Sequence, residues 1–190
     1  MRAGVTHGVV VLLAVFGVAG LVVVASLAVV GALALVGVGR PLAIVRESFW
    51  GYELWLVFAV AAVGVAGSLY LSEVAGYVPC ELCWYQRICM YPLALLTLLA
   101  ALANDYRVAR YLLPLPVIGA GVSVYHLLVE NGVVHESQGC QISAPGGCSV
   151  KWINEFGFMT IPTLALTGFA LVFAFLLLAV FEPGLPSEAE

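Results

Sequence analysis

The sequence predicts an all-α integral membrane protein, in which one extra N-terminal transmembrane helix precedes a four-helix transmembrane bundle. Composition is the first observation behind this prediction, because 63% of the residues are hydrophobic and only 9% are charged, whereas soluble domains have about 25% charged residues. The second observation is a series of five long apolar segments separated by short polar loops. A helix needs about 20 apolar residues to cross a bilayer, and each segment is long enough.

The five apolar segments cover residues 9–38, 54–71, 82–103, 111–129 and 159–181. The first has no charged residue, and at about 30 residues it is long for one span, so it should tilt or protrude. We expect a retained helix rather than a signal peptide, because its apolar run is about twice a normal signal core and only Arg2 precedes it. We therefore divide the chain into an extra transmembrane segment, residues 1–45, and a four-helix domain, residues 46–190, with a polar loop at 130–158.

The distribution of basic residues predicts the orientation in the membrane. Four of the six arginines lie in the loops after the first and third segments: Arg40, Arg46, Arg107 and Arg110. The loop at 73–79 has no basic residue, and the loop at 131–158 has only Lys151. Because cytoplasmic loops are enriched in Arg and Lys, the arginine-bearing loops should be inside and the other two outside. The N-terminus is then outside and the tail, residues 182–190, inside.

Four of the five cysteines form two pairs, and both pairs fall on the predicted external face. Cys80 and Cys83 form a Cys-x-x-Cys motif where the third segment begins, and Cys140 and Cys148 lie in the later polar loop. Disulfides form and persist outside the cytoplasm. Two dithiols beside a bilayer indicate electron transfer between soluble thiol proteins and a lipid-soluble carrier. Cys89 lies within the third segment, where we expect a buried thiol that acts as a small hydrophobe.

The Cys-x-x-Cys motif has the setting of a reactive pair. Pro79 precedes it and good helix formers follow, so a helix should begin near Cys80. Free N–H groups and the dipole at a helix N-terminus favour a thiolate. Arg87 falls on the same helical face as both cysteines. It should stabilise the Cys83 thiolate or an oxygen of a reduced quinone, the alternative being an anchor at the membrane interface.

Three other features limit the interpretation. The net charge of −4 and the absence of a basic patch argue against a nucleic-acid partner. The two cysteine spacings leave a four-cysteine zinc site open, but an oxidising external face suits zinc poorly and we expect no metal. Trp152 and Phe156 are four residues apart, which fits either a short helix on the membrane surface or an irregular aromatic segment.

Two stretches resemble a known family. Gly-Ser-Leu-Tyr-Leu-Ser-Glu at 67–73, followed by Pro-Cys-Glu-Leu-Cys-Trp-Tyr-Gln-Arg-Ile-Cys-Met-Tyr-Pro-Leu at 79–93, resembles the disulfide bond formation protein B (DsbB) family. The stretches at 147–152 and 156–162 are similar to its short branch from Gram-positive bacteria, often called BdbC. The resemblance covers roughly residues 54–181 and leaves the first apolar segment outside.

The resemblance implies a membrane thiol oxidase with a four-helix fold. Such a protein reoxidises an extracytoplasmic thioredoxin-fold (DsbA-like) disulfide donor and passes the electrons to a membrane quinone, menaquinone or ubiquinone. It implies that Cys80 and Cys83 are the quinone-proximal pair, with the Cys83 thiolate facing the quinone and Arg87 beside it.

The resemblance also assigns the loop cysteines and one histidine. Cys140 and Cys148 would exchange with the partner, and Cys140 would form the mixed disulfide. His126 matches a position that is often polar in the family, so it either hydrogen-bonds a quinone carbonyl or is an interfacial histidine with a polar partner.

Three alternatives remain on the sequence alone. A membrane protein could use both disulfides only to staple its loops, or a reductant conduit could send electrons outward. A vitamin K epoxide reductase-like enzyme would share four helices, a Cys-x-x-Cys motif and a quinone. The run Cys-Glu-Leu-Cys-Trp-Tyr-Gln-Arg at 80–87 speaks against this last alternative.

Overall fold

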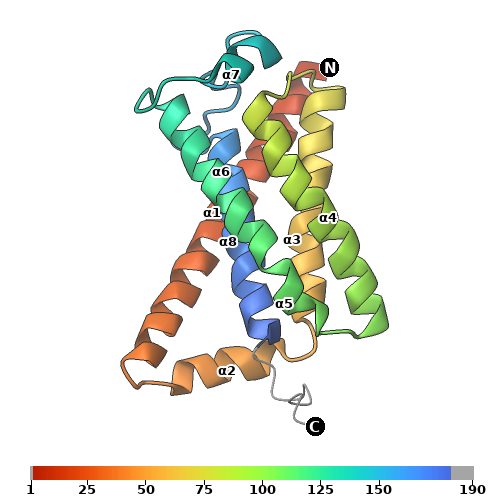
Figure 1. Ribbon diagram of the computed structural model, residues 1–190, viewed down its shortest axis with the longest axis vertical. Helices are drawn as coiled ribbons and strands as arrows, with labels where there is room; N and C mark the ends of the chain where they lie inside the picture. Colours follow the sequence, from red (N-terminus) through yellow and green to blue (C-terminus); the bar gives the residue numbers. More distant parts are fainter. Residues whose placement is uncertain (1, 181–190) are drawn as a thin grey trace.

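The structure is a computed structural model that describes residues 2–180, and nearly every ordered element in that range is helical (Figure 1). The predicted cytoplasmic tail, residues 182–190, lies outside the described residues. The elements are α1 (Arg2–Leu35), α2 (Arg40–Phe49), α3 (Glu53–Leu69), a π-helical turn η1 (Tyr70–Val74), α4 (Glu81–Ala103), α5 (Val108–Leu112), α6 (Pro114–Glu130), α7 (Gln138–Ser143) and α8 (Ile161–Val180).

Within the described residues, five helical stretches are long and apolar enough to cross a membrane, which confirms the predicted fold class. They cover Gly4–Leu35, Glu53–Val74, Glu81–Ala103, Val108–Glu130 and Ile161–Val180. Helix α1 has 34 residues, or about 50 Å at 1.5 Å per residue, so it exceeds the hydrocarbon thickness of about 30 Å. It runs at an incline to the other spans in Figure 1.

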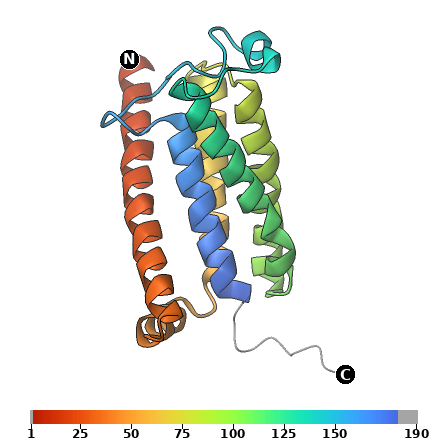
Figure 2. The ribbon, with the colours of Figure 1, turned by 60° about the vertical axis from the view of Figure 1, so that its left-hand side comes forward.

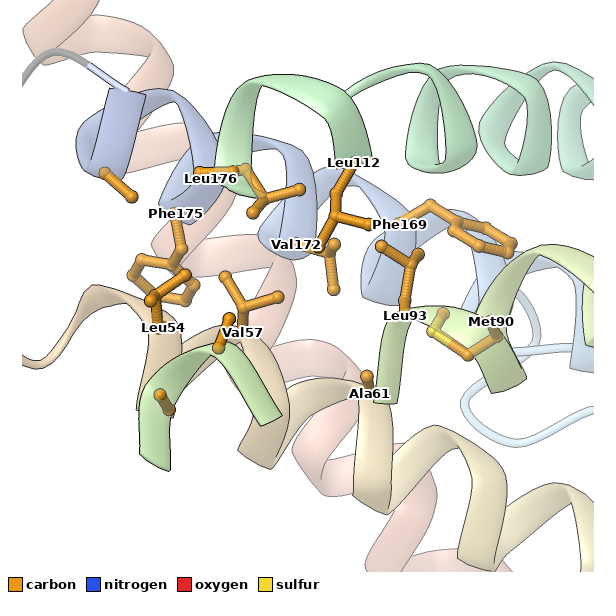
Figure 3. Packing of buried hydrophobic residues seen from close by; sticks show 14 of the residues in the cluster. Leu54, Val57, Ala61, Met90, Leu93, Leu112, Phe169, Val172, Phe175 and Leu176 are labelled. Atoms are coloured by element: carbon orange, nitrogen blue, oxygen red, sulfur yellow. The ribbon is translucent and has the colours of Figure 1, made fainter. Parts of the chain in front are cut away.

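The main hydrophobic core lies between α3, α4 and α8 (Figure 3). Leu54 and Val57 of α3, Leu93 of α4 and Phe169 of α8 are at most 1% exposed. Helix α6 approaches α8 closely through Gly119, where a Cβ atom would collide with the Phe169 ring. This packing fixes α3, α4, α6 and α8 relative to one another, and so it fixes the ends of these helices that carry the cysteines.

The two ends of the bundle differ in charge. Helices α2 and α5, which contain or adjoin the loop arginines, lie at the end opposite α7 (Figure 1). Both cysteine pairs lie at the α7 end. Helix α2 was not predicted, and it spans the boundary that we placed at residues 45 and 46, so the division into two domains stays a prediction.

The aromatic segment before α8 is irregular rather than helical. Phe156 and Gly157 have positive φ angles of 56° and 79°, which end any helix there. Glu155 and Met159 form an isolated antiparallel bridge. Trp152 stacks on Tyr77 with the ring centroids 5.2 Å apart, so this segment is tied to the loop that leads into α4.

Candidate functional site

Cys80 caps the N-terminus of α4, as predicted from Pro79. Its backbone is extended, with φ −74° and ψ 172°, and its Sγ accepts a hydrogen bond from the N–H of Cys83 at 3.4 Å. The Sγ atoms of Cys80 and Cys83 are 2.8 Å apart, and both cysteines are free thiols. Cys80 is 5% exposed. The Cys-x-x-Cys motif therefore presents a reduced, closely spaced dithiol at a helix N-terminus.

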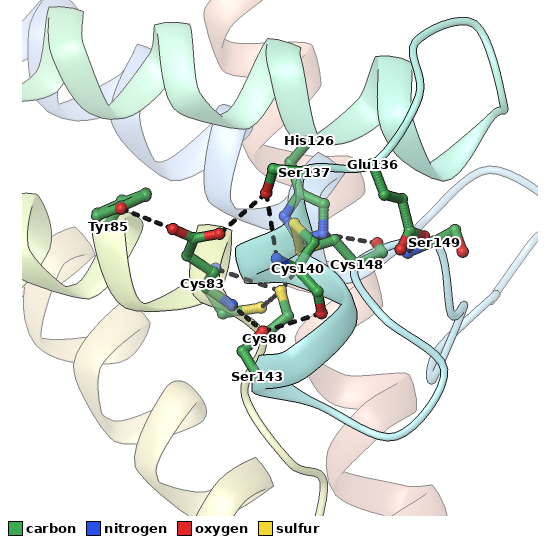
Figure 4. The surroundings of a disulfide bond; sticks show 11 residues. Cys80, Cys83, Tyr85, His126, Glu136, Ser137, Cys140, Ser143, Cys148 and Ser149 are labelled. Carbon is green, nitrogen blue, oxygen red and sulfur yellow. Dashed lines mark hydrogen bonds between the residues drawn. A yellow bond between two sulfur atoms is a disulfide. The ribbon is translucent and has the colours of Figure 1, made fainter.

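The second pair forms a disulfide that is packed against the first pair (Figure 4). Cys140 and Cys148 are 0% and 2% exposed. Together with Cys80 they belong to one buried cluster, against which the Cys83 side chain packs. The fold thus brings together all four cysteines that the sequence placed at one face.

Helix α7, which bears Cys140, is held on α4 by one residue, Glu81, through its carboxylate and its backbone N–H. Glu81 accepts a hydrogen bond from Ser137 Oγ at 3.0 Å, and its backbone N–H donates to Ser143 Oγ at 2.9 Å. Tyr85 donates to the other carboxylate oxygen at 2.9 Å. The same carboxylate lies so close to Gly139 that a Cβ atom could not fit there. Ser137 and Ser143 flank Cys140, so Glu81 holds the loop disulfide beside the Cys-x-x-Cys motif.

His126 of α6 links the two cysteine pairs (Figure 4). Its Nε2 lies 3.1 Å from the Cys148 carbonyl oxygen and 3.7 Å from Cys80 Sγ. Because a carbonyl oxygen only accepts, Nε2 carries the proton in this arrangement. The Nδ1 atom is buried and has no hydrogen-bond partner among the described residues. His126 is therefore buried at the junction of the pairs rather than at the lipid surface.

These contacts stabilise negative charge on Cys80. The hydrogen bond from the Cys83 thiol is the largest contribution, and together with His126 it lowers the pKa of the Cys80 thiol to about 5, against the opposing effect of burial. The reduced pair therefore has its negative charge on Cys80. The assignment of Cys83 as the thiolate that faces a quinone stays a prediction.

Arg87 is buried on α4, one turn beyond Cys83. It is 9% exposed, and it donates from Nε to Ser68 Oγ at 2.9 Å and from Nη2 to the Ser68 carbonyl at 3.1 Å. Its guanidinium also lies 5.1 Å from the centre of the Trp84 ring. Among the described residues no carboxylate pairs with it. This position differs from that of an interface anchor, which keeps its charged end in water.

A cavity of about 460 Å³ extends from the dithiol into the apolar part of the bundle. The polar side chains at its lining include Cys80, Cys83, Gln86, Arg87, His126 and Glu130, and most of the remaining lining is apolar. Tyr91 also lines the cavity, and its buried hydroxyl has no hydrogen-bond partner in the part of the chain that is described. The cavity therefore suits an amphipathic ligand with a polar head next to the cysteines.

The donor atoms of Cys80, Cys83 and His126 lie within 4.8 Å of one another, as the ligands of a metal would. Two thiolates bound to one tetrahedral zinc at about 2.3 Å would be about 3.8 Å apart, whereas these sulfurs are 2.8 Å apart. The other two cysteines, which a four-cysteine site would need, are joined to each other. This geometry suits a redox dithiol better than zinc.

Sequence reasoning missed several polar residues of the site. Glu81 and Gln86, which bonds to Ser123 Oγ at 3.1 Å, have partners on segments distant in sequence. Glu130 is buried and accepts from Thr160 at 2.9 Å. An acidic residue at the end of an apolar segment is itself a signal of function, and it was available from the sequence.

The comparisons with known proteins agree with this geometry. The family model of disulfide bond formation protein DsbB matches residues 52–179. The chain belongs to the DsbB family. The matched part begins just before α3, so α1 and α2 lie outside it.

The curated relatives fall in the branch that the sequence motifs indicated. The chain is 45% identical to disulfide bond formation protein C of Bacillus subtilis over 126 residues, which are 66% of this chain and 90% of that protein. It is 44% identical to a probable disulfide formation protein of Oceanobacillus iheyensis over 131 residues, 69% of this chain and 90% of the relative. A similar protein of Deinococcus radiodurans is 39% identical over 133 residues, 65% of this chain and 86% of the relative. No solved structure matches significantly.

Membership of the DsbB family implies a membrane protein with disulfide oxidoreductase activity. The predicted resemblance to the BdbC branch is therefore confirmed. The match also weighs against a vitamin K epoxide reductase-like enzyme.

Proposed function

We propose that this protein oxidises an extracytoplasmic thioredoxin-fold disulfide donor and delivers the electrons to a membrane quinone, menaquinone or ubiquinone. The observation that supports this most is the joining of both cysteine pairs in one buried cluster at the mouth of an apolar cavity. If the disulfides only cross-linked loops, the protein would not need a free dithiol, with its two sulfur atoms 2.8 Å apart, packed against the Cys140–Cys148 disulfide.

The first step is thiol–disulfide exchange with the partner. A partner thiolate attacks Cys140, the partner's second thiol resolves the mixed disulfide, and the partner leaves oxidised while Cys140 and Cys148 are left as thiols. The loop disulfide is buried in the docked position, so α7 must move away from Glu81 before a partner can reach it. The loop sequence contains Gly139, Gly146 and Gly147, which suits such movement.

The second step returns the loop pair to its oxidised state. The reduced loop pair attacks the Cys80–Cys83 disulfide, which takes the two electrons and becomes the dithiol seen in this structure. A thiol of low pKa leaves readily in such an exchange, so the contacts from Cys83 and His126 favour the release of Cys80. Docking of α7 by Glu81 brings the two pairs together for this transfer.

The cavity fits the head group of a quinone. Tyr91 and His126 each have a buried polar atom without a partner among residues 2–180, and Arg87 belongs to the same lining. We propose that Arg87 and His126 hold the head group, with Cys83 nearest to it: Arg87 would donate to a quinone oxygen, and His126 Nδ1 would accept from a hydroxyl of the reduced quinone. A bound quinone supplies a two-electron, two-proton acceptor that restores the Cys80–Cys83 disulfide. The apolar remainder of the cavity excludes water from the dithiol.

The orientation follows from the charge of the two ends. The end with α2 and α5 holds four arginines, and we propose that it faces the cytoplasm. Both cysteine pairs then face the outside, where an oxidised partner can persist.

The test is catalytic oxidation of a reduced thioredoxin-fold partner by the purified protein with a soluble quinone analogue. Cys140→Ser should abolish oxidation. Cys83→Ser should permit at most one turnover through the loop disulfide, because that disulfide can no longer be regenerated. Cys89→Ala is the matched control and should retain full turnover, because the Cys89 thiol is buried in the main core.

The outcome distinguishes a relay, in which electrons pass from the Cys140–Cys148 pair to the Cys80–Cys83 pair, from two disulfides that act independently. Multiple turnover by Cys83→Ser would exclude the relay and the role of the Cys-x-x-Cys motif. Loss of turnover in Cys89→Ala comparable to that in Cys83→Ser would show that the pairs are wrongly assigned. Absence of quinone dependence in the unmodified protein would refute the proposed electron acceptor.

A further inference from the structure

Helix α1 lies outside the family match, yet it forms one wall of the cavity that begins at the cysteines. Figure 2 shows α1 beside α8, and Figure 1 shows that the C-terminal half of α1 diverges from the bundle. The match already covers 90% of the Bacillus subtilis relative, which leaves that protein no room for a helix of 34 residues. The wall is thus a feature of this chain that the four-helix core does not supply.

The N-terminal half of α1 is packed closely against the core. Val10 and Ala14 are 4% and 0% exposed. A Cβ atom on Gly17 would lie 2.5 Å from Leu164 Cδ2, and one on Gly20 would lie 2.9 Å from Thr167 Cγ2. Both contacts are with α8, and the absence of side chains on these glycines lets the two helices approach. The position of α1 is therefore set by packing.

Helix α1 also contacts α3. A Cβ atom on Gly67 of α3 would lie 3.2 Å from Leu13 Cδ2. Contacts with both α3 and α8 place α1 against these two helices, on the side where the cavity lies. The residues of α1 that line the cavity are Leu13, Phe16, Gly17, Ala19, Gly20 and Val23.

All six lining residues of α1 are apolar, and they extend the cavity away from its polar end. Leu13 and Val23 are ten residues apart, which is about 15 Å along a helix. The cavity thus continues from the dithiol, Arg87 and His126 into a long apolar channel between α1, α3 and α8. A ligand that fills it needs a polar head and an extended apolar chain.

We infer that α1 forms the wall of the channel that holds the isoprenoid tail of the quinone, and that it makes the site selective for tailed quinones. This inference rests on the proposed function, because the tail is placed by a head group at the dithiol. A phospholipid acyl chain matches the apolar part but has no redox-active group to occupy the end lined by Cys80 and Cys83. The continuity of the channel with the dithiol is what favours the quinone.

Two neighbouring valines provide a matched test. Val23 lines the cavity, whereas Val22 does not and is 62% exposed, since neighbouring residues of a helix point about 100° apart. The full-length protein is assayed for partner oxidation with a long-tailed quinone and with a head-group analogue that has no tail. Val23→Trp should raise KM for the tailed quinone about tenfold and leave KM for the tailless analogue within twofold. Val22→Trp should leave both values within twofold.

A second pair of variants removes bulk instead of adding it. Phe16 lines the cavity, and the adjacent Val15 does not, although both are more than half exposed. Phe16→Ala should raise KM for the tailed quinone, and Val15→Ala should not. Activity with the tailless analogue shows whether each variant is folded. If a Trp variant does not insert into the membrane, the comparison of Phe16→Ala with Val15→Ala decides the test.

The results distinguish this inference from the proposed function. Turnover of the unmodified protein with both quinones, together with equal effects of the lining and non-lining variants, would overturn the role of α1 alone. If the unmodified protein turned over with neither the tailed quinone nor the tailless analogue, the proposed function would be overturned, and this inference with it. Native mass spectrometry that finds a phospholipid which the tailed quinone does not displace would also overturn the assignment of the channel.

Discussion

The low pKa of Cys80 should make the Cys80–Cys83 disulfide a strong oxidant. A thiolate that is stabilised in the reduced state favours reduction of the disulfide. With the pKa of Cys80 at about 5, the thiolate gains about 1.4 kcal/mol for each pH unit up to pH 7, hence about 3 kcal/mol. For a two-electron couple this corresponds to a reduction potential about 60 mV higher than that of a pair with an ordinary thiol.

His126 is the part of this stabilisation that a mutation can remove without destroying the pair. Its Nε2 lies 3.7 Å from Cys80 Sγ, a long contact, so we take about 1.5 kcal/mol, the lower end for a hydrogen bond to a charged group. His126→Leu should then raise the pKa of Cys80 by about one unit. It should lower the reduction potential by about 30 mV.

The assay uses a background in which Cys140 and Cys148 are serine and Cys89 is alanine, so that only one pair remains. Equilibration with glutathione buffers gives the potential, and the pH dependence of alkylation gives the pKa. Ser123→Ala is the control, because Ser123 lies on the same helix but bonds to Gln86 instead of the thiols. An unchanged or higher potential in His126→Leu would refute the argument that His126 stabilises the thiolate.

Four other predictions follow from the site. Arg87→Gln should weaken quinone binding by about tenfold to a hundredfold, the worth of a charge-assisted hydrogen bond; unchanged quinone dependence of the rate would leave Arg87 a structural residue. Glu81→Gln should loosen α7, so that a soluble dithiol reduces the Cys140–Cys148 disulfide faster; an unchanged rate would contradict the docking role. After reduction, a membrane-impermeant thiol reagent should label both loop cysteines from outside, and labelling only from the cytoplasm would reverse the topology. Because folding lowers the pKa of Cys80, the contribution of Cys80 to the stability of the reduced protein should be fully present above the ordinary thiol pKa and should be lost as the pH falls through about 5; a Tm that is flat over this range would contradict it.

The transmembrane architecture and the pairing of the cysteines could be predicted because both are local signals. Hydropathy identifies each span independently, and Pro79 fixes the start of α4 without reference to other segments. The distribution of arginines separated the two ends of the bundle. Helix α2 was missed because its ten residues are too few for a span, although Arg40 and Arg46 lie in it and its apolar residues have helical spacing.

The contacts that tune the site depend on tertiary packing and could not be predicted. Arg87 was expected next to Cys83, but its hydrogen bonds go to Ser68, which is 19 residues away on another helix. His126 was assigned a quinone contact or an interfacial position, and the structure adds its contacts with Cys80 and with the Cys148 carbonyl. No periodicity in one helix reports which residue of another helix faces it.

The buried position of the loop disulfide constrains how the two proposed exchange steps would alternate. With Cys140 completely buried against Cys80 and α4, a partner cannot reach the disulfide while α7 is docked, and the internal exchange cannot occur while α7 is away. The hydrogen bonds of Glu81 with Ser137 and Ser143 connect surface groups, and each contributes only about 1 kcal/mol. That strength is enough to favour the docked state and small enough for a partner interface to overcome. In the proposed mechanism, the same loop would therefore serve a soluble partner when α7 is undocked and the Cys80–Cys83 pair when α7 is docked.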